Sequence, residues 1–393
     1  MSTILAVVGA AVPWFRFPFL TLQCSGSVFC SRILVPFAVL RSSFFVTFFV
    51  LRPSFLVPQV LLLETPSGLY CPSGDFHIDP WQPVPRALIT HAHGDHARFG
   101  SAAYLCAEDC APLLRRRFGP APVIETLPYG AARQIGSVGV SFHPAGHVLG
   151  SSQIRMEGAD GVWVLSGDYK RAPDPTCALF EPVRCDTFIT ESTFGLPLYR
   201  WDPGDAIVAE IVEWWDTNRE RGLTSVLFCY TIGKAQRVLA ELAAVTDRAV
   251  HVHGMMLPMI EAYRERGIMM APTIALTERP RGTSFAGELV LAPPSARGTP
   301  WMRRLGQISD ALASGLMRVR GVRRQRAYDR GFVLSDHADW PSLLQTITES
   351  GAGRVLATHG HADPLARFLA SQGLDSGVIR TAWEGELGAD DHE

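Results

Sequence analysis

Residues 87–100 read ALITHAHGDHARFG, and four of the six positions from His91 to His96 carry side chains that bind metal ions. The apolar run before them predicts a buried strand that ends at this cluster. Imidazole nitrogens and carboxylate oxygens are ligands for Zn²⁺ and similar ions. Alternate residues of an extended turn point the same way, so His91 and His93 can share one ion while Asp95 faces a neighbouring position. The stretch therefore predicts a metal site at the exit of a strand.

Three further ligands also stand at predicted strand exits. His147 follows the strand in VGVSFHPAGH, Asp168 follows GVWVL, and His359 follows RVLAT. An aspartate has two oxygens and can bridge two ions, and two ions about 3.5–4 Å apart can hold both an attacking hydroxide and the phosphate oxygens. A lone histidine is more often a core or surface residue, so the prediction depends on the placement that all these side chains share.

The order of the predicted elements divides the 393 residues into one catalytic domain with an insert. Short strands punctuated by Gly and Pro run over 61–198, and alternating strands and helices over 199–328 predict an α/β insert with its own parallel sheet. Strands with exit-loop histidines return over 329–388. A helix is predicted in EDCAPLLRRRFG, with acids in its first turn and three arginines in its last.

Residues 1–60 form an apolar extension of a different character. Positions 1–63 hold no Asp or Glu and four Arg. Three interpretations stay open. A membrane anchor would need about 20 apolar residues, and Pro36 and Arg41 interrupt the best window. A secretory signal would want positive charge before its apolar core. We favour the third interpretation, upstream sequence translated from a start codon set too early.

The overall composition favours no particular class of partner. The formal net charge is −2 and 47% of the residues are hydrophobic, so any signal for nucleic acid must be local and no stable membrane partner is expected. The eight cysteines show no CxxC spacing, which predicts reduced thiols in a cytoplasmic protein. Cys106 and Cys110 form a CxxxC, a weak zinc signal that we interpret as flanking a strand-to-helix turn.

In their order and spacing, the motifs resemble the metallo-β-lactamase fold in its β-CASP nuclease branch. THAHGDH, AGHVLGS and SGDYK match the successive metal motifs of that fold, and ITESTFG, SDHAD and THG match three motifs that mark the branch. GKAQRVL resembles the Gly-basic-x-Gln helix start of its inserted cap domain. YCPSGDFHIDPW and PPSARGTPWMRR are similar to the bacterial ligase-associated DNA exonuclease group, which is related to the nucleases of mRNA 3′-end processing. The resemblance runs from about Leu61 to Glu386 and implies an α/β fold, an αββα sandwich with an inserted α/β β-CASP cap.

The resemblance also implies a role for each motif residue. The first zinc ion would be held by His91, His93 and His147, the second by Asp95, His96 and His359, with Asp168 bridging the two. Asp79 matches the aspartate that supports the histidine loop and is counted with Asp95 among the catalytic residues, Asp75 being the weaker choice. Glu191 would orient His337, which would protonate the leaving oxygen. Taken singly, Glu191 is better explained as a turn cap and His337 as a neighbour of a helix N-cap.

The local signal for nucleic acid lies in MRVRGVRRQRAYDR, which holds six arginines and one acid. Such a cluster neutralises phosphates without reading sequence, although a solvated face is its usual explanation. The run leads into the strand before His337, which favours phosphate contact. The predicted contacts are Arg318, Arg320, Arg323, Arg324, Arg326 and Lys234.

These residues predict a two-zinc phosphodiesterase acting on a nucleic-acid chain, with hydroxide attack on phosphorus and His337 as general acid. The resemblance favours a DNA exonuclease of DNA repair, with an ATP-dependent DNA ligase as functional partner. His359 is also typical of RNA-processing members, so an endo- or exoribonuclease is the alternative. A small-molecule hydrolase or a non-catalytic binding module is disfavoured. The histidines expected to be structural or exposed are His77, His143, His361 and His392. For His251 and His253, in HVHG at a strand end of the insert, lining of the cleft and ordinary strand alternation both stay open.

Overall fold

The computed structural model describes residues 6–7, 21–22 and 60–383. The chain separates into two units, Met1–Leu56 and Val57–Glu393. In the first unit, strands β1 (Ala6–Val7) and β2 (Thr21–Leu22) pair antiparallel. The three interpretations of the extension otherwise fall outside the described residues, as do His392 and the predicted end of the catalytic domain at 384–388.

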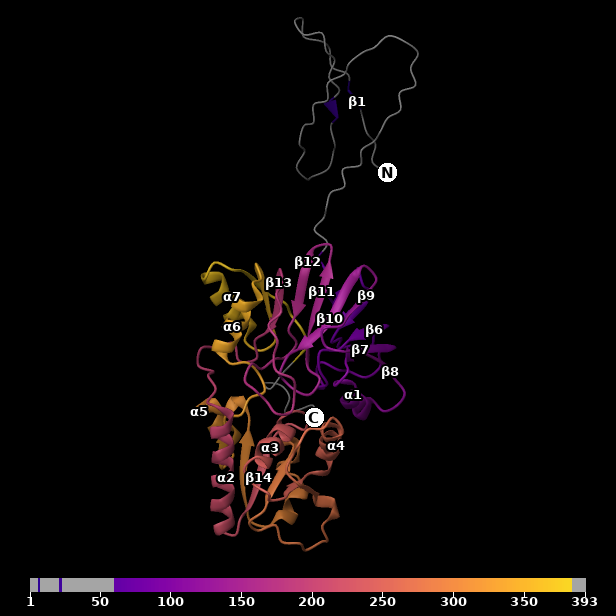
Figure 1. Ribbon diagram of the computed structural model, residues 1–393. Helices are drawn as coiled ribbons and strands as arrows, with labels where there is room; N and C mark the ends of the chain where they lie inside the picture. The colour runs from indigo at the N-terminus through magenta and orange to yellow at the C-terminus, as the bar shows by residue number, and fades with distance from the viewer. Residues whose placement is uncertain (1–5, 8–20, 23–59, 384–393) are drawn as a thin grey trace, which may run out of the picture. The chain divides into compact units, whose positions relative to one another are not determined.

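Two mixed sheets make up the catalytic part of the second unit (Figure 1). The first sheet pairs its strands in chain order: β3 (Leu63–Thr65), β4 (Gly68–Cys71), β5 (Phe76–Ile78), β6 (Arg86–Leu88), β7 (Ala103–Ala107) and β8 (Val123–Leu127). The second sheet, in the order β21-β20-β13-β12-β11-β10-β9, contains β9 (Ala132–Ile135), β10 (Val138–Pro144), β11 (Ser152–Gly158), β12 (Gly161–Leu165), β13 (Thr187–Glu191), β20 (Arg354–Thr358) and β21 (Asp375–Val378). Because β13 pairs in parallel with both β12 and β20, the segment after the insert completes the sheet begun before it.

One apolar core lies between the two sheets, and helices cover their outer faces. Phe76 from the first sheet and Phe142 from the second belong to the same buried cluster. Helix α1 (Ala111–Phe118) packs on the outer face of the first sheet, and α6 (Trp340–Ser350) and α7 (Ala362–Ser371) pack on that of the second. The layers are therefore helix, sheet, sheet, helix, which confirms the predicted αββα sandwich.

Helix α1 begins later than its sequence suggested. Its N-cap is Cys110, so Glu108 and Asp109 lie before the helix and the prediction of acids in its first turn is wrong. Pro112 explains the shift, because a proline fits the first turn of a helix, where its missing N–H has no intrahelical partner. The arginines in the last turn, Arg115–Arg117, are as predicted.

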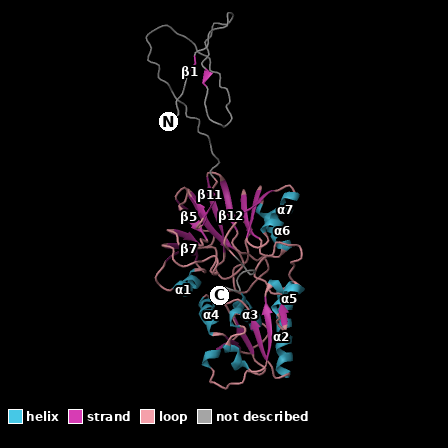
Figure 2. Cartoon of the chain, turned by 180° about the vertical axis from the view of Figure 1, so that it is seen from behind, coloured by secondary structure: helices cyan, strands magenta, loops and turns pink. Residues whose placement is uncertain are grey.

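The insert has a parallel sheet of its own, with the order β16-β15-β17-β14-β18-β19. Its strands are β14 (Thr224–Phe228), β15 (Val250–Val252), β16 (Thr273–Ala275), β17 (Leu289–Ala292), β18 (Ile308–Ala313) and β19 (Arg330–Phe332). Its helices are α2 (Gly204–Glu220), α3 (Lys234–Ala243), α4 (Leu257–Glu265) and α5 (Arg320–Arg326), with 3₁₀ turns at Gly254–Met256, Leu276–Glu278, Pro294–Ala296, Pro300–Leu305 and Gly315–Arg318. Helices α2, α3 and α4 lie beside the strands in Figure 2, and their buried side chains share one cluster with them. Since β19 pairs with β18, this sheet extends beyond position 328.

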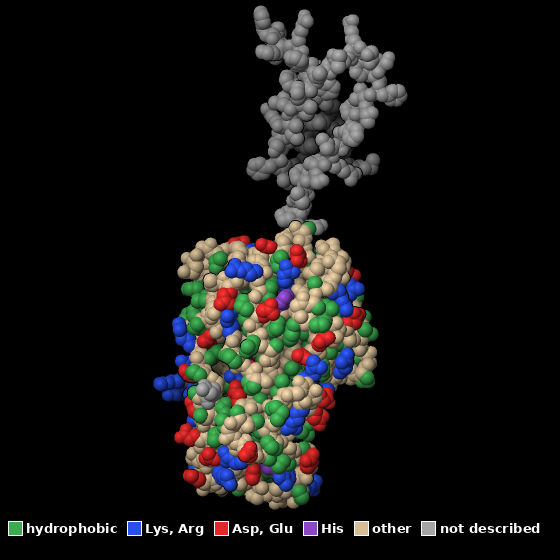
Figure 3. Space-filling view, viewed as in Figure 1, with side chains coloured by type: hydrophobic (Ala, Val, Ile, Leu, Met, Phe, Trp, Pro, Cys, Tyr) green, Lys and Arg blue, Asp and Glu red, His purple; other side chains and the backbone are tan. Residues whose placement is uncertain are grey.

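On the face shown in Figure 3, acidic and basic side chains are interspersed. That face therefore carries no extended patch of one charge. This matches the formal net charge of −2. Within the described part of the chain, no helix combines the length and the apolar character that crossing a bilayer requires.

Candidate metal centre

Four loops bring the predicted metal ligands together. His91 to His96 follow β6, His147 follows β10, Asp168 follows β12 and His359 follows β20. In each of two groups the ligand atoms lie within 4.8 Å of one another: His91, His93, His147 and Asp168 form the first, and Asp95, His96 and His359 the second. Strands hold the loops that follow them in fixed positions, so distant parts of the sequence supply one compact site.

The first group has the spacing that a zinc ion requires. His93 Nδ1 lies 3.1 Å from both His91 Nε2 and His147 Nε2. Asp168 Oδ2 lies 3.6 Å from His91 Nε2 and 3.8 Å from His147 Nε2. Zinc bonds of about 2.0–2.1 Å in a tetrahedron place neighbouring ligand atoms about 3.3 Å apart. The four atoms therefore surround a position that fits a zinc ion.

Two histidines of this group are oriented through their other ring nitrogen. His147 donates from Nδ1 to the backbone carbonyl of Asp336 at 2.7 Å, and His93 donates from Nε2 to the carbonyl of Ile232 at 3.1 Å. A carbonyl oxygen can only accept, so these bonds fix the tautomer of each ring. The opposite nitrogens, His147 Nε2 and His93 Nδ1, then keep their lone pairs for a metal ion.

The second group contains buried polar atoms that no described protein group satisfies. His96 Nε2, Asp168 Oδ1 and both ring nitrogens of His359 are buried without a hydrogen-bond partner among the described residues. His96 Nε2 lies 3.5 Å from Asp168 Oδ2 and 3.6 Å from Asp95 Oδ2, and His359 Nδ1 lies 3.8 Å from Asp168 Oδ1. An unsatisfied buried group costs about 1–3 kcal/mol. A cation between these atoms would remove that cost, so the group fits a second metal ion, with Asp168 facing both positions.

Asp79 supports the histidine loop from the core. Its carboxylate accepts hydrogen bonds from the backbone N–H of Thr90 at 2.8 Å, from the Thr90 hydroxyl, and from His96 Nδ1 at 2.8 Å. Thr90 Oγ1 in turn lies 3.1 Å from His91 Nδ1. One buried aspartate therefore orients a histidine of each group.

The two groups differ in charge. Burial lowers the pKa of His91 and His147, and neighbouring imidazoles lower it further, so both rings are neutral at pH 7. Burial also acts to lower the pKa of His96, but nearby carboxylates, Asp168 first among them, outweigh it and raise the pKa to about 10. His91 and His147 are thus neutral ligands, whereas His96 lies among the carboxylates of Asp168 and Asp95, whose negative charge a divalent cation would balance.

Two site residues have a left-handed backbone. His359 has φ 66° and Asp79 has φ 41°. A residue with a Cβ pays about 1–2 kcal/mol in this region, and such strain is concentrated at functional sites. Gly360 follows with φ 63°, and a Cβ there would lie 2.4 Å from the Cα of Thr193. The close packing of this turn against the end of β13 holds His359 in place.

His337 lies beside both groups and is held by Glu191. Its Nδ1 lies 3.0 and 3.1 Å from the two carboxylate oxygens of Glu191 and 4.0 Å from Asp168 Oδ2. The backbone N–H of Tyr169 fixes Glu191 from the other side, 2.7 Å from Oε1. A carboxylate on Nδ1 favours the protonated imidazole, which then carries a transferable proton on Nε2. Asp168, Glu191 and His337 are also close enough to share a cation.

The structure corrects the prediction that Lys234 contacts nucleic acid. Its side chain is fully buried, with the ammonium 3.6 Å from the carboxylate of Asp336. Arg237, one turn further along α3, lies 3.4 Å from the same carboxylate, and Lys170 lies 3.9 Å from it. A buried ammonium needs such an anionic partner. Lys234 is therefore part of an ionic network inside the protein and faces no solvent that a phosphate could occupy.

The predicted arginine contacts lie on and beside α5. The exposed ones are Arg318, Arg320, Arg323 and Arg324, and Arg326 is half-buried. Arg318 pairs with Asp202 at 3.1 Å, and the indole of the adjacent Trp201 donates to the carbonyl of His337 at 2.8 Å. The arginine segment thus borders the loop that carries His337.

The other predicted positions take no part in these groups. Among the described residues, the histidines outside them are His77, His143, His251, His253 and His361. Asp75 is exposed and accepts a hydrogen bond from the Tyr70 hydroxyl. Cys106 lies in β7 and Cys110 immediately precedes α1, so the pair flanks a strand-to-helix turn as interpreted.

Several partners of the site, among them Trp383, Ile232 and Thr90, escaped the sequence analysis. The Trp383 ring stacks on His96 with ring centroids 4.8 Å apart, and its indole N–H donates to the carbonyl of Asp79 at 2.9 Å. Ile232 contributes a backbone carbonyl, which any residue can supply, and Trp383 stands alone after the last motif, so neither has a sequence signal. Thr90 does have one, because its hydroxyl directly precedes the first histidine of the cluster.

No family model matches the chain. Over 327 residues the chain is 31% identical to a protein of Opitutus terrae named probable DNA ligase, an alignment that covers 82% of this chain and 31% of that protein. It is 27% identical over 213 residues to transcription termination factor FttA of Thermococcus kodakarensis, covering 44% of this chain and 32% of the relative. It is 27% identical over 219 residues to a ribonuclease of Thermus thermophilus, covering 48% and 47%. The chain therefore spans between 31% and 47% of the length of these relatives.

A solved structure adds to the fold assignment. A protein of unknown function from Enterococcus faecalis V583 superposes with a TM-score of 0.52 at 13% identity, over 76% of this chain and 80% of that one. At this identity the likeness concerns the fold alone. The sandwich with its insert, the two ligand groups and the sequence relatives agree: the chain belongs to the metallo-β-lactamase fold family, in its β-CASP branch and near the ligase-associated group.

Proposed function

We propose that this chain is a two-zinc phosphodiesterase that acts on nucleic acid as a DNA exonuclease. The observation that carries the proposal is the position of His337, which is held by Glu191 and lies 4.0 Å from the carboxylate that both ligand groups share. When bound, two zinc ions would supply an ionised water at neutral pH and would neutralise charge on the phosphate. The ligands would be His91, His93 and His147 for one ion, Asp95, His96 and His359 for the other, and Asp168 for both.

The protein's own groups would then complete the reaction. His337 would give the proton on Nε2 to the leaving oxygen, and the carboxylate of Glu191 would stabilise the imidazolium before transfer. Asp79 would keep the histidine loop in register through its bonds to Thr90 and His96. The exposed arginines of α5 would bind backbone phosphates, a contact that fixes the strand without reading its bases.

The choice of DNA is supported by the relative named probable DNA ligase, which is about three times as long as the matched segment. The relative, by its name, joins a ligase to a segment similar to this chain. We therefore expect an ATP-dependent DNA ligase to be the functional partner of this chain. The alternative is an RNA-processing nuclease. Two observations favour it: His359 lies in the second ligand group, and the Thermus thermophilus relative is named a ribonuclease.

We also propose, on the basis of its cysteines, that the protein acts in the cytoplasm. None of Cys71, Cys106, Cys110, Cys177 and Cys185 forms a disulfide within the described ranges. Secreted proteins usually oxidise their cysteines, whereas cytoplasmic ones keep them reduced.

The test is to incubate the zinc-loaded protein with single- and double-stranded DNA and RNA labelled at the 5′ or the 3′ end. Stepwise shortening of DNA from one end, abolished by a chelator, is expected. Internal cutting of RNA with DNA left intact would establish the alternative. Intact strands in every case, with two zinc ions measured in the protein, would overturn both.

A further inference from the structure

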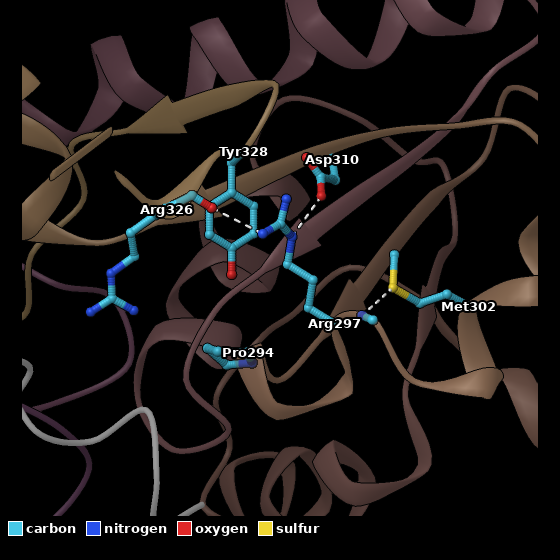
Figure 4. Close-up of a pocket in the computed structure, with 7 residues that line it drawn as sticks. Pro294, Arg297, Met302, Asp310, Arg326 and Tyr328 are labelled. Carbon is cyan, nitrogen blue, oxygen red and sulfur yellow. Dashed lines mark hydrogen bonds and ion pairs between the residues drawn. The ribbon is translucent and has the colours of Figure 1, made fainter. Parts of the chain in front are cut away.

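A pocket of about 520 Å³ lies in the insert, outside the metal centre (Figure 4). One wall is the segment after β17, with Pro294, Arg297 and Met302. Tyr328, just past the end of α5, and Asp310 on β18 also line the pocket. None of these residues belongs to the groups that could hold a metal ion.

The guanidinium of Arg297 is held in one fixed plane. Its Nε donates to the carboxylate of Asp310 at 2.8 Å, and its two terminal nitrogens donate to the carbonyls of Arg326 at 2.9 Å and Ala327 at 2.7 Å. One flat side lies over the ring of Tyr328, with the guanidinium carbon 3.9 Å from the ring centroid. The side chain is still 31% exposed. Its nitrogens are bonded at the edge and one flat side is covered by Tyr328, so the second flat side is the part of this pocket-lining guanidinium left for a ligand.

A flat, delocalised and weakly hydrated cation is a stacking surface for a planar ring. Proteins that bind single strands stack unpaired bases on arginine planes as well as on aromatic rings. A phosphate would instead need the N–H groups at the edge, and each nitrogen of Arg297 already donates one of these to the protein. Of the other lining residues, Pro294 and Met302 are apolar, which suits the flank of a base, and Arg326 is a cation that suits the phosphate attached to it.

The surroundings place the pocket beside the proposed path of a strand. Helix α5, which ends at the carbonyls to which Arg297 donates, carries the exposed Arg320, Arg323 and Arg324. Strand β18 leads from Asp310 towards Gly315, where a Cβ would lie 2.5 Å from the ring of Phe194. The Phe194 ring centroid lies 5.9 Å from that of His337. Five residues of extended chain span at most about 18 Å, and Phe194 and His337 follow from Gly315, so a single strand of several nucleotides would reach from the metal centre to the pocket.

We propose that this pocket is a subsite for one unpaired nucleobase of the bound strand, which stacks on the second face of Arg297 while the strand's phosphates lie along α5. The inference rests on the proposed nuclease function and adds a base contact to it. Because every base has a flat face, the subsite accepts DNA and RNA and reads little sequence.

The test is an abasic scan. Fluorescently labelled single strands of DNA and of RNA, each lacking the base at one position, are titrated against the zinc-loaded His337→Gln protein, which slows cleavage during the measurement. Base stacking contributes about 1–3 kcal/mol, so loss of the base at one position should weaken binding about 5- to 150-fold, and other positions should matter much less. In a protein that also carries Arg297→Lys, this position dependence should disappear.

Arg304→Lys is the matched control, because Arg304 also donates to a backbone carbonyl and lies over an aromatic ring, Phe285, but lines no part of this pocket. It should leave the scan unchanged. Arg320→Gln should lower the salt dependence of binding and keep the sensitive position. Tight binding with no sensitive position in the scan would overturn the subsite and leave the nuclease function standing, even if Arg297→Lys fails to fold. Absence of binding to any strand would overturn the nuclease function and the subsite together.

Discussion

The imidazole of His147 donates its Nδ1 proton to the backbone carbonyl of Asp336, which lies 2.7 Å away and 189 positions later in the sequence. His93 has the same relationship with Ile232, 139 positions later. Both carbonyls follow strands of the insert's sheet, β14 and β19. Two ligands of the first group are therefore oriented by loops that follow strands of the insert's sheet, which makes this sheet a structural part of the metal centre.

Replacing Lys234 by methionine should weaken zinc binding without touching a ligand. The change leaves Asp336 with one cation fewer in a buried network, and breaking such a pair costs about 3–5 kcal/mol. The loop that presents the Asp336 carbonyl should shift, and His147 should lose its fixed tautomer. We expect a lower melting temperature and faster loss of the first zinc ion to a chelator dye.

The control for this variant is a pair on the surface. Arg133 and Glu125 are 2.6 Å apart and both are exposed, so Arg133→Met should change stability by less than about 1 kcal/mol and leave zinc release unaltered. Equal zinc release from Lys234→Met and the unaltered protein would show that the network does not support the metal centre.

The same network should make the free energy of unfolding of the protein depend on pH in the acidic range. Burial alone would raise the pKa of Asp336, but Lys234, Lys170 and Arg237 lower it to about 2, from 3.8 in a model compound. A carboxyl group whose pKa is lower in the folded than in the unfolded protein stabilises the fold at any pH above its unfolded-state pKa. For Asp336 this contribution is about 2 kcal/mol, and it is lost as the pH falls from about 4 to about 2. Urea unfolding at pH 7, 4, 3 and 2 measures it. Asp336→Asn should be less stable at pH 7 and should lose less between pH 4 and pH 2, and parallel curves for the two proteins would contradict the assignment.

His337→Ala should retain its zinc and lose about 100- to 10,000-fold in turnover, the usual contribution of a general acid. Single-turnover hydrolysis and zinc analysis of the same sample measure both quantities. His361→Ala is the matched control, because that ring stacks on Tyr199 outside the ligand groups. Loss of a zinc ion from the His337 variant would instead make His337 a ligand, alongside Asp168 and Glu191.

Asp168 and Asp95 should differ in how many ions they hold. Asp168→Asn removes a charge that faces both groups, so the variant should retain less than one zinc ion per chain. Asp95→Asn affects the second group alone and should retain about one. Elemental analysis after gel filtration gives the stoichiometry, and equal zinc content in the two variants would exclude a bridging role for Asp168.

Much of the site could be predicted because its chemistry is local in the sequence. The cluster from His91 to His96 is contiguous, and His147, Asp168 and His359 each stand within a few residues of an apolar run that a strand requires. Periodicity and ligand type are both visible in one sequence, so the strands and the ligand loops followed from them, whereas the sandwich was implied by the resemblance of the motifs to a known fold.

What the sequence could not provide depends on contacts between distant segments. Lys234 looked like an accessible base at a helix start, and its burial depends on Asp336 and Lys170, which lie far away along the chain. The carbonyl of Ile232 and the ring of Trp383 join the site for the same reason. The start of helix α1, by contrast, depends on a local signal. The helix begins at Ala111 because of Pro112, and the acidic residues Glu108 and Asp109 wrongly suggested an earlier start.

The placement of β20 between β13 and β21 has a consequence for synthesis of the protein. A chain still growing on the ribosome and shorter than about 355 residues has β13 as an open edge and no His359, since both the neighbouring strand and that ligand come after the insert. The insert must emerge before the sandwich can close. Acquisition of the full metal complement therefore waits until the insert and the segment through His359 have both been synthesised.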